Sequence, residues 1–303
     1  MTPYSGIWPV APTPFHEDGS LDEPGMRRVL DCLIDQGADG ICILANFSEQ
    51  FLLSDAEREL LTRLCIEHID GRVPVIVTIS HFATRIAVER AQLAKSLGAA
   101  IVMMMPPYHG ALLKGNAQQT FDQFAAVGEV GIPIMIQDAP LSGVDLPVPL
   151  LVKMAREIEM VKLFKIECPQ AANKLRSLIA EGGSAIEGPF DGEEGITLLA
   201  DLDAGARGSM TSGMIVDQIK PVIELYHAGQ TDEAADAYAR VLPVINHENR
   251  LCGWRSCKAA MVEGGVIKFD FCRHPIDPLP QPVRERLLTL LRRLDPLVLR
   301  WGQ

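Results

Sequence analysis

The chain has 303 residues, of which 48% are hydrophobic and 22% are charged, the composition of a folded protein with a sizeable core. This length exceeds the usual single domain but suits an α/β barrel that folds as one unit. The formal net charge of −11 argues against nucleic acid and anionic membrane surfaces as partners.

The N-terminal segment has neither the basic start nor the apolar stretch of a secretion signal, and no apolar run in the chain reaches membrane-spanning length. The seven cysteines are odd in number, scattered and without a CxxC pair, which predicts reduced thiols in the cytoplasm. No metal is expected, because the one cluster that can be drawn has no standard spacing: Cys252, Cys257, Cys272 and His274.

Strand-like and helix-like segments alternate along the chain. Short apolar runs predict strands at residues 7–15, 41–45, 74–80, 99–105, 133–137, 160–167, 184–188 and 208–211. Helical patterns with end signals predict helices at residues 26–36, 84–97, 118–127, 149–157, 172–180 and 194–202. A further helix is predicted after a capping box formed by Ser54 and Glu57. Beyond residue 230 we expect helices alone, at residues 233–244, 256–263 and 283–299.

Strands of this length that alternate with longer helices pair in parallel through right-handed crossovers. Eight such units need about 250 residues, so we predict an α/β fold, a (β/α)8 TIM barrel with a C-terminal helical extension. The barrel would be a catalytic domain of residues 1–229, with residues 230–303 packed on it. A doubly wound open sheet is the alternative, but no GxGxxG follows an early strand and eight units favour closure.

The strand predicted at residues 160–167 carries two lysines, which is unusual for a buried strand. Side chains alternate across a strand, so Lys165 shares a face with Glu167 near the carboxyl end, while Lys162 points the other way. Burial of an amine lowers its pKa from about 10.4 and makes it nucleophilic near neutral pH. Taken alone, the spacing fits a salt bridge at a strand end equally well.

Polar side chains gather after the predicted strands, where the active sites of such barrels lie. The set is Asn46, Ser48, Glu49, Ser80, His81, Tyr108, His109, Gln137, Asp138, Lys165, Glu167, Glu187, Asp191, Thr211 and Ser212. His81 and His109 are more simply interpreted as loop histidines. Asp191, with Glu193 and Glu194, is interpreted as an acidic cluster at a helix N-terminus.

Three segments resemble the dihydrodipicolinate synthase and N-acetylneuraminate lyase superfamily, class I (β/α)8 enzymes that form a Schiff base with a 2-keto acid. Ala45-Asn46-Phe47-Ser48-Glu49 matches the family's Gly-Thr-Thr-Gly-Glu carboxylate loop in position, Pro107-Tyr108-His109 matches its Pro-Tyr-Tyr motif, and Lys165 matches its lysine. The similarity covers essentially the whole chain. It implies no cofactor, a small-molecule 2-keto-3-deoxy sugar acid as partner, and a homo-oligomer, namely a tetramer.

Departures from the family pattern bear on the reaction. Gln137 replaces the family's tyrosine after strand five, and Asn46-Phe47 and His109 replace residues with hydroxyl groups. The usual aldolase relies on that proton relay, so aldol cleavage is disfavoured. Longer stretches instead resemble superfamily dehydratases that convert L-2-keto-3-deoxyarabonate to 2-oxoglutarate semialdehyde, at residues 43–50, 105–110, 136–140, 164–167, 187–194 and 245–250.

The resemblance implies a role for each candidate residue. Lys165 would condense with the C2 ketone, and Glu167 would move protons between C3 and C5. Backbone N–H groups around Phe47 and Ser48, beside Asn46, would hold the substrate carboxylate. The distal hydroxyls would meet polar side chains, with four candidates: Gln137, His109, Ser80 and Glu187.

Two alternatives stay open. Another enzyme of the superfamily, either a dehydratase for a different keto-deoxy sugar acid or a pyruvate-releasing aldolase, would use the same lysine. A non-catalytic keto-acid sensor on the same scaffold is more distant, since a fold does not fix a function. The presence of both Lys165 and Glu167 argues against the sensor.

Overall fold

A computed structural model describes residues 4–303, so the first three residues of the N-terminal segment and of the predicted barrel domain lie outside it. The chain divides into two compact units. The first unit holds residues 4–5, Pro74–Glu193 and Thr197–Met210, and the second holds Gly6–Val73, Glu194–Ile196 and Thr211–Gln303. The two units do not test the domain boundary predicted after residue 229, which stays a prediction.

Six parallel strands form the core of the first unit, in the order β10-β9-β8-β7-β4-β3. Their bounds are β3 Val75–Thr78, β4 Ile101–Met104, β7 Ile134–Asp138, β8 Val161–Ile166, β9 Pro189–Asp191 and β10 Gly208–Ser209. These runs are rich in Val, Ile and Met and almost wholly buried, as expected for parallel strands covered on both faces. A small hairpin, which the sequence did not predict, is formed by β5 Tyr108–His109 and β6 Leu113–Lys114.

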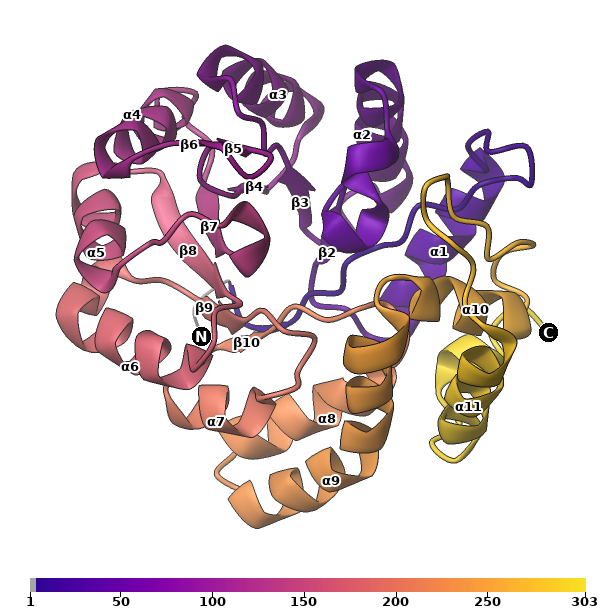
Figure 1. The fold of residues 1–303 in the computed structure, drawn as a ribbon. Coiled ribbons are helices and arrows are strands. Elements are labelled where there is room, and N and C mark those ends of the chain that lie inside the picture. Colours follow the sequence, from indigo (N-terminus) through magenta and orange to yellow (C-terminus); the bar gives the residue numbers. More distant parts are fainter. Residues whose placement is uncertain (1–3) are drawn as a thin grey trace. The chain divides into compact units, whose positions relative to one another are not determined.

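Helices of the first unit form a row outside these strands (Figure 1). Their bounds are α3 Thr84–Leu97, α4 Ala117–Gly128, α5 Val148–Glu157, α6 Ala171–Gly182 and α7 Leu198–Asp203. End signals explain several of these bounds, since Asn116 and Gln119 form a capping box at α4 and Gly98 ends α3 in a left-handed conformation. The alternation of parallel strands and helices agrees with the predicted α/β class.

The second unit holds two short strands, β1 Gly6–Ile7 and β2 Ile41–Ile43. Its helices are α1 Glu23–Asp35, α2 Asp55–Ile69, α8 Val216–His227, α9 Thr231–His247, α10 Arg255–Glu263 and α11 Gln281–Arg292. A π-helical turn at Glu248–Cys252 follows α9 directly. The capping box of Ser54 and Glu57 is confirmed at the start of α2.

Four predicted elements differ clearly in their bounds from the structure, and local backbone chemistry explains three of these differences. The strand predicted at residues 7–15 ends after Ile7, since Pro9, Pro12 and Pro14 lack the N–H groups that a ladder needs. The strand predicted at residues 184–188 lies instead at Pro189–Asp191. The helix predicted at residues 194–202 begins only at Leu198, because the preceding Glu194 and Gly195 have φ values of 55° and 87°.

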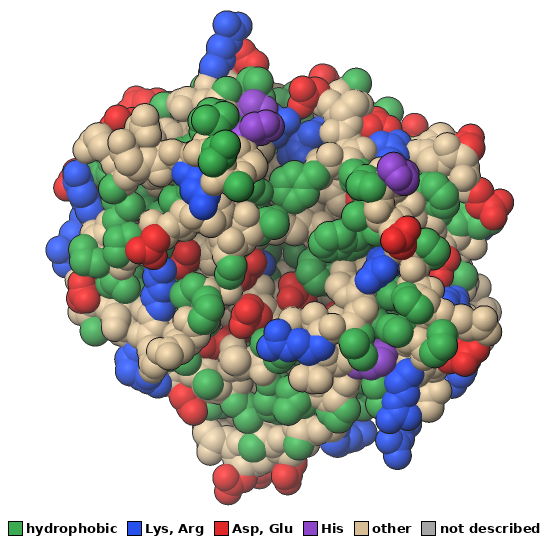
Figure 2. Space-filling view, viewed as in Figure 1, with side chains coloured by type: hydrophobic (Ala, Val, Ile, Leu, Met, Phe, Trp, Pro, Cys, Tyr) green, Lys and Arg blue, Asp and Glu red, His purple; other side chains and the backbone are tan. Residues whose placement is uncertain are grey.

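The last predicted helix, at residues 283–299, ends at Arg292. Asp295, with φ of 50°, and Pro296 interrupt it, and a separate 3-10 turn follows at Leu297–Leu299. None of the helices within residues 4–303 combines the length and the apolar character that a bilayer crossing needs. In the space-filling view, basic, acidic and hydrophobic side chains are intermixed on the face shown (Figure 2).

Candidate active site

Lys165 lies near the carboxyl end of β8, where only 4% of its surface is exposed. It is held between two neighbouring strands, opposite Gln137 of β7 and Phe190 of β9. Its Nζ donates hydrogen bonds to Oε1 of Glu167 and, at 2.9 Å, to the carbonyl oxygen of Gly192. A buried amine thus meets one carboxylate and one backbone acceptor.

Glu167 follows β8 directly and bridges two neighbours of the lysine site. Its backbone N–H donates to the Asp138 carbonyl at 3.0 Å, which continues the pairing of β7 with β8. Its Oε1 accepts a 2.8 Å hydrogen bond from Nε2 of Gln137. The predicted proximity of Lys165 and Glu167 is confirmed, while their roles stay predictions. The arrangement can exchange a proton between an amine and a carboxylate that a neutral amide orients.

Asp138, at the end of β7, is a further carboxyl group near this trio. It is buried and pairs with Lys174 of α6 at 2.6 Å. Burial raises the pKa of Asp138, and the hydrogen bond and charge of Lys174 oppose that rise. Asp138 therefore has its own cation, and Glu167 remains the carboxyl group that contacts the Lys165 amine.

Ser80 lies two residues after β3, and His109 is the last residue of β5. The Ser80 hydroxyl accepts from the Met105 N–H at 3.0 Å, which ties the loops after β3 and β4 together. His109 is exposed on the hairpin, with its ring 6.3 Å from that of Phe82. The neighbouring Tyr108 hydroxyl is buried without a hydrogen-bond partner in the described residues, and burial raises its pKa. Tyr108 thus offers an unsatisfied polar atom.

Glu187 is not brought to Lys165. Because the strand predicted at residues 184–188 lies at Pro189–Asp191, Glu187 precedes the strand instead of following it. Its N–H donates to the Lys162 carbonyl at 3.0 Å, and its carboxylate lies 3.5 Å from the Lys162 amine. Lys162 stands near the amino end of β8, the end away from Lys165.

The carboxyl end of β9 instead places Asp191 and Gly192 beside the lysine. The interpretation of Asp191 as part of an acidic cluster at a helix start is wrong, since α7 begins only at Leu198. Asp191 is fully buried and accepts a 2.5 Å hydrogen bond from Ser209. Gly192 was not predicted at all, because the only sequence signal for it is the absence of a side chain.

A Cβ built on Gly192 would lie 2.5 Å from Cγ of Glu167 and 2.9 Å from the Ile166 carbonyl oxygen. Real Cβ atoms do not approach so closely, and the Cγ of Lys165 would be 3.0 Å away. The close packing of this segment against Lys165 and Glu167 therefore requires glycine at position 192.

The loop predicted to hold a carboxylate lies in the second unit and is formed by two short 3-10 turns, Asn46–Ser48 and Gln50–Leu52. Ser48 is buried, and its hydroxyl donates to the Ala11 carbonyl at 2.7 Å and accepts from the Ala45 N–H at 3.1 Å. The Ser48 N–H donates to the Ala45 carbonyl at 2.9 Å. The structure thus engages both polar groups of Ser48 within the unit.

Asn46 and Phe47, the other predicted residues of this loop, are half-buried. Asn46 Oδ1 accepts from Gln50 Nε2 at 2.7 Å, and the Phe47 ring lies edge-on to Trp254 with centroids 6.5 Å apart. The loop is therefore held in place by its own side chains and by the helix that follows Gly253.

Glu49 closes this loop in a left-handed conformation, with φ of 58°. Its buried carboxylate pairs with Lys258 of α10 and accepts from the Arg273 N–H at 3.3 Å. Lys258 is fully buried, donates to the Phe271 carbonyl at 2.9 Å and lies 4.5 Å above the Phe15 ring. Sequence reasoning missed this pair, whose members are 209 positions apart.

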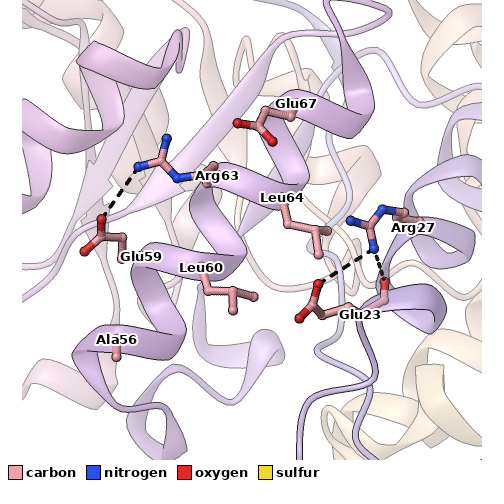
Figure 3. Close-up of a pocket in the computed structure, with 8 residues that line it drawn as sticks. All are labelled: Glu23, Arg27, Ala56, Glu59, Leu60, Arg63, Leu64 and Glu67. Carbon is pink, nitrogen blue, oxygen red and sulfur yellow. Dashed lines mark hydrogen bonds and ion pairs between the residues drawn. The ribbon is translucent and has the colours of Figure 1, made fainter.

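Two grooves of the second unit are lined by none of the residues predicted for the lysine chemistry. One of about 410 Å³ lies between α1 and α2, and its charged side chains pair with each other, Arg27 with Glu23 and Arg63 with Glu59 (Figure 3). Leu60 and Leu64 lie between these pairs. Within residues 4–303, no group of three or more His, Cys, Asp and Glu side chains is arranged to hold a metal ion.

Comparisons with known proteins cover nearly the whole chain. A sequence profile described as the Dihydrodipicolinate synthetase family matches residues 3–294. The L-2-keto-3-deoxyarabonate dehydratase of Azospirillum brasilense is 55% identical over 300 residues, which cover 99% of this chain and 97% of that protein.

Solved structures resemble the chain over nearly its full length. The dihydrodipicolinate synthase of Rhodopseudomonas palustris has a TM-score of 0.87 at 26% identity, over 97% of this chain and 99% of that one. YagE of Escherichia coli K12, a prophage protein of the dihydrodipicolinic acid synthase family solved with pyruvate, has a TM-score of 0.87 at 27% identity, over 96% and 99%. The predicted (β/α)8 barrel fold is confirmed.

Proposed function

Because the chain belongs to the dihydrodipicolinate synthetase family, we propose that it is a Schiff-base-forming dehydratase that converts L-2-keto-3-deoxyarabonate to 2-oxoglutarate semialdehyde and water. The observation that carries this proposal is the buried Lys165 amine in contact with Glu167, whose carboxylate is oriented by Gln137. The similarity to the Azospirillum dehydratase supports the substrate, and a role in non-phosphorylating pentose catabolism follows from it.

The proposed reaction begins when the Lys165 amine attacks the C2 ketone and water leaves, giving an iminium ion. The iminium acidifies the C3 protons, and Glu167 removes one to form an enamine. The enamine expels the C4 hydroxyl, which leaves as water once it has taken up a proton. Loss of a C5 proton gives a dienamine that carries an enol at C5. Protonation at C3 and at C4, with loss of the enol hydroxyl proton, then leaves an aldehyde at C5. Hydrolysis of the iminium then frees the product, with a net loss of one water.

Glu167 suits this sequence because each proton transfer takes place within a few bonds of C3. The carboxylate contacts the amine that becomes the iminium nitrogen, so it lies beside the carbon atoms that follow C2 in the adduct. Gln137 holds it with a neutral amide that cannot itself exchange protons at neutral pH. Gln137 in place of the family tyrosine supports dehydration over aldol cleavage.

The substrate contacts are proposed on the same basis. The Asn46–Ser48 turn is the proposed site for the carboxylate, through Asn46 and the backbone around Phe47. The distal hydroxyls are assigned to Gln137, Ser80 and His109, with the unsatisfied Tyr108 hydroxyl as a further donor. Glu187 is not carried into the proposal, because its carboxylate pairs with Lys162.

We further propose that the protein acts in the cytoplasm as a homo-oligomer, namely a tetramer. Its seven cysteines are free thiols, which suits a reducing compartment. The β5–β6 hairpin exposes Leu112 at 93% and Leu113 at 52%, and exposed apolar side chains of this kind are often covered in an assembly. Light scattering in solution tests the proposal, and a monomer mass would contradict it.

The function is tested by incubating the protein with L-2-keto-3-deoxyarabonate and following semialdehyde through a coupled NAD(P)-linked dehydrogenase. A parallel sample is reduced with borohydride and analysed by peptide mass spectrometry. We expect semialdehyde together with an adduct on Lys165. Lys165→Ala should lose both signals, whereas Glu167→Gln should keep the adduct and lose dehydration. An adduct without semialdehyde would reject this substrate, and trapping in Lys165→Ala would reject the nucleophile.

A further inference from the structure

Two fully buried aspartates lie next to the lysine site, in the first unit. Asp191 ends β9, in register with Ile166 of β8 and with Ser209 of β10. Asp201 lies on α7. Each is 0% exposed, which is rare for carboxyl groups unless a partner or a proton neutralises them.

The hydrogen bonds around the two carboxyl groups are unequal. Asp191 accepts from the Ser209 hydroxyl at 2.5 Å on one oxygen and from the Glu193 N–H at 3.3 Å on the other. Asp201 accepts from the Thr197 hydroxyl at 2.6 Å on Oδ2 alone. Its Oδ1 is buried, and no donor of the described residues is directed at it. A buried carboxyl oxygen without a donor is explained if it carries a proton itself.

The electrostatic surroundings of the two carboxyl groups agree with that geometry. Burial, and then the negative charge of Asp191, raise the pKa of Asp201 to about 8. Burial also raises the pKa of Asp191, but hydrogen bonds from Ser209 and from Asp201, the Glu193 amide and the charge of Lys165 oppose that rise. The donors on both oxygens of Asp191 and the absence of one at Oδ1 of Asp201 therefore place the proton of the pair on Asp201, which donates to Asp191.

Asp191 is connected to Lys165 in two ways. Gly192 follows Asp191 directly, and its carbonyl oxygen accepts from the Lys165 amine at 2.9 Å. The contacts of Asp191 with Ser209 and Glu193 hold both sides of that carbonyl group in place. In addition, the charges of Asp191 and Lys165 act on each other within a region that excludes water.

We propose that Asp191 is a positioning residue for the Lys165 amine, that its buried negative charge stabilises the ammonium and iminium forms of Lys165, and that Asp201 supplies the hydrogen bond that keeps Asp191 charged. The inference rests on the proposed function, in which Lys165 forms the imine. The groups that face the pair are Lys165 from β8, Glu193 from the loop after β9, Ser209 from β10 and Thr197 at the start of α7.

Asparagine substitutions distinguish the two aspartates, because asparagine resembles a protonated carboxyl group but not a charged one. In Asp201→Asn, the amide donates to Asp191 and accepts from Thr197, as the protonated carboxyl does. In Asp191→Asn, the negative charge is lost although the side chain keeps its size. The proposal therefore predicts that the first variant retains the behaviour of Lys165 and that the second changes it.

The measurement is the pH dependence of borohydride trapping on Lys165, with pyruvate as the probe. Loss of the Asp191 charge lets the amine lose its proton at lower pH, so the midpoint of trapping in Asp191→Asn should fall by about one pH unit. Turnover with L-2-keto-3-deoxyarabonate should fall about tenfold, because the iminium loses its neighbouring charge. Asp201→Asn should keep the wild-type midpoint. Ser209→Ala, which removes one donor to Asp191, should shift the midpoint in the same direction by less.

Several outcomes would overturn the proposal. If Asp191→Asn lowers the amount of adduct but leaves the midpoint unchanged, the role of Asp191 is purely structural. A shift in Asp201→Asn equal to that in Asp191→Asn would contradict the assignment of the proton. If Asp191→Asn fails to fold, the Ser209→Ala midpoint decides the question alone. Absence of any wild-type adduct overturns the proposed function together with this inference, whereas a wild-type adduct with no shift in the variants overturns the inference alone.

Discussion

Gln137 donates a 2.8 Å hydrogen bond to Oε1 of Glu167, the same oxygen that accepts from the Lys165 amine. The amide and the amine thus both donate to one carboxylate oxygen, and together they fix the orientation of the carboxylate. Because Gln137 pairs in register with Lys165 across β7 and β8, the strand pairing itself determines this geometry.

The first prediction removes the Gln137 amide. Gln137→Leu keeps most of the volume but leaves Glu167 without its neutral donor, so the carboxylate can rotate away from the reacting carbons. We expect kcat for dehydration to fall by about tenfold to a hundredfold, while pyruvate is still trapped on Lys165. The control is Gln118→Leu, which removes an exposed Gln-to-Asp hydrogen bond on α4 and should leave kcat unchanged. Unchanged kcat in Gln137→Leu would remove Gln137 from the mechanism.

The second prediction concerns Gly192, whose lack of a side chain allows the segment after β9 to approach the lysine. In Gly192→Ala the new methyl group meets Glu167 and the Ile166 carbonyl, so the two side chains of the site must move. Displacement of catalytic groups by about 1 Å costs about a hundredfold in rate, and we expect kcat/KM to fall by that order. Gly183→Ala is the control for general destabilisation in the same unit: nothing lies within 4 Å of its Cβ position, but its φ of 56° strains alanine without touching the site. Equal losses in both variants would show that the effect is general destabilisation.

The proximity of Lys165 and Glu167 could be predicted from sequence because it depends only on strand alternation, which is local. The place of Glu187 could not, because it depends on where β9 begins. The five-residue displacement from residues 184–188 to Pro189–Asp191 moves Glu187 to the opposite end of the strand. Because of the same displacement, Asp191 and Gly192 lie at the carboxyl end of β9, the position that the sequence predicted for Glu187.

The fold class could be predicted because the alternation of buried strands with helices is repeated along the whole chain. Irregular backbone limited the rest. Residues 7–15 are apolar like a strand, but their three prolines lack the N–H groups that a ladder needs. The left-handed backbone at residues 194 and 195 moves the start of α7 to Leu198. The contact of Glu49 with Lys258 joins positions 209 apart, for which one sequence carries no signal.

The third prediction tests that buried pair. Lys258→Met removes the cation and leaves the Glu49 carboxylate buried, which should lower the free energy of unfolding by about 3–5 kcal/mol. Glu49→Gln combined with Lys258→Met removes both charges and should recover much of that loss. Both are measured by urea denaturation followed by circular dichroism.

The matched control for this pair is Arg85→Ala. Arg85 and Glu89 form an exposed pair on α3, so its removal should not change stability measurably. If the double variant is less stable than Lys258→Met alone, the two side chains do not stabilise the fold as a pair.

The fourth prediction concerns Glu248, at the start of the π-helical turn, whose side chain is buried and accepts from the Ser256 hydroxyl at 2.5 Å. Burial raises its pKa from 4.5 to about 7, against hydrogen bonds from Ser256 and Ser212. The folded state therefore keeps this proton to higher pH than the unfolded state. The contribution of Glu248 to stability is fully present below pH 4.5 and is lost as the pH rises through about 7.

Glu248→Gln keeps the acceptor for Ser256 but cannot ionise, so its effect should depend on pH. Near pH 4.5 the variant should match the wild type, and above pH 7 it should be more stable by at most about 3 kcal/mol. Urea denaturation at several pH values measures this difference. Thr289→Ala, an exposed change on α11 that removes no titratable group, should give a difference that does not vary with pH. If Glu248→Gln also gives a constant difference, the carboxyl group is already charged in the folded protein, and the neighbouring serines must then supply enough hydrogen bonding to hold a buried anion.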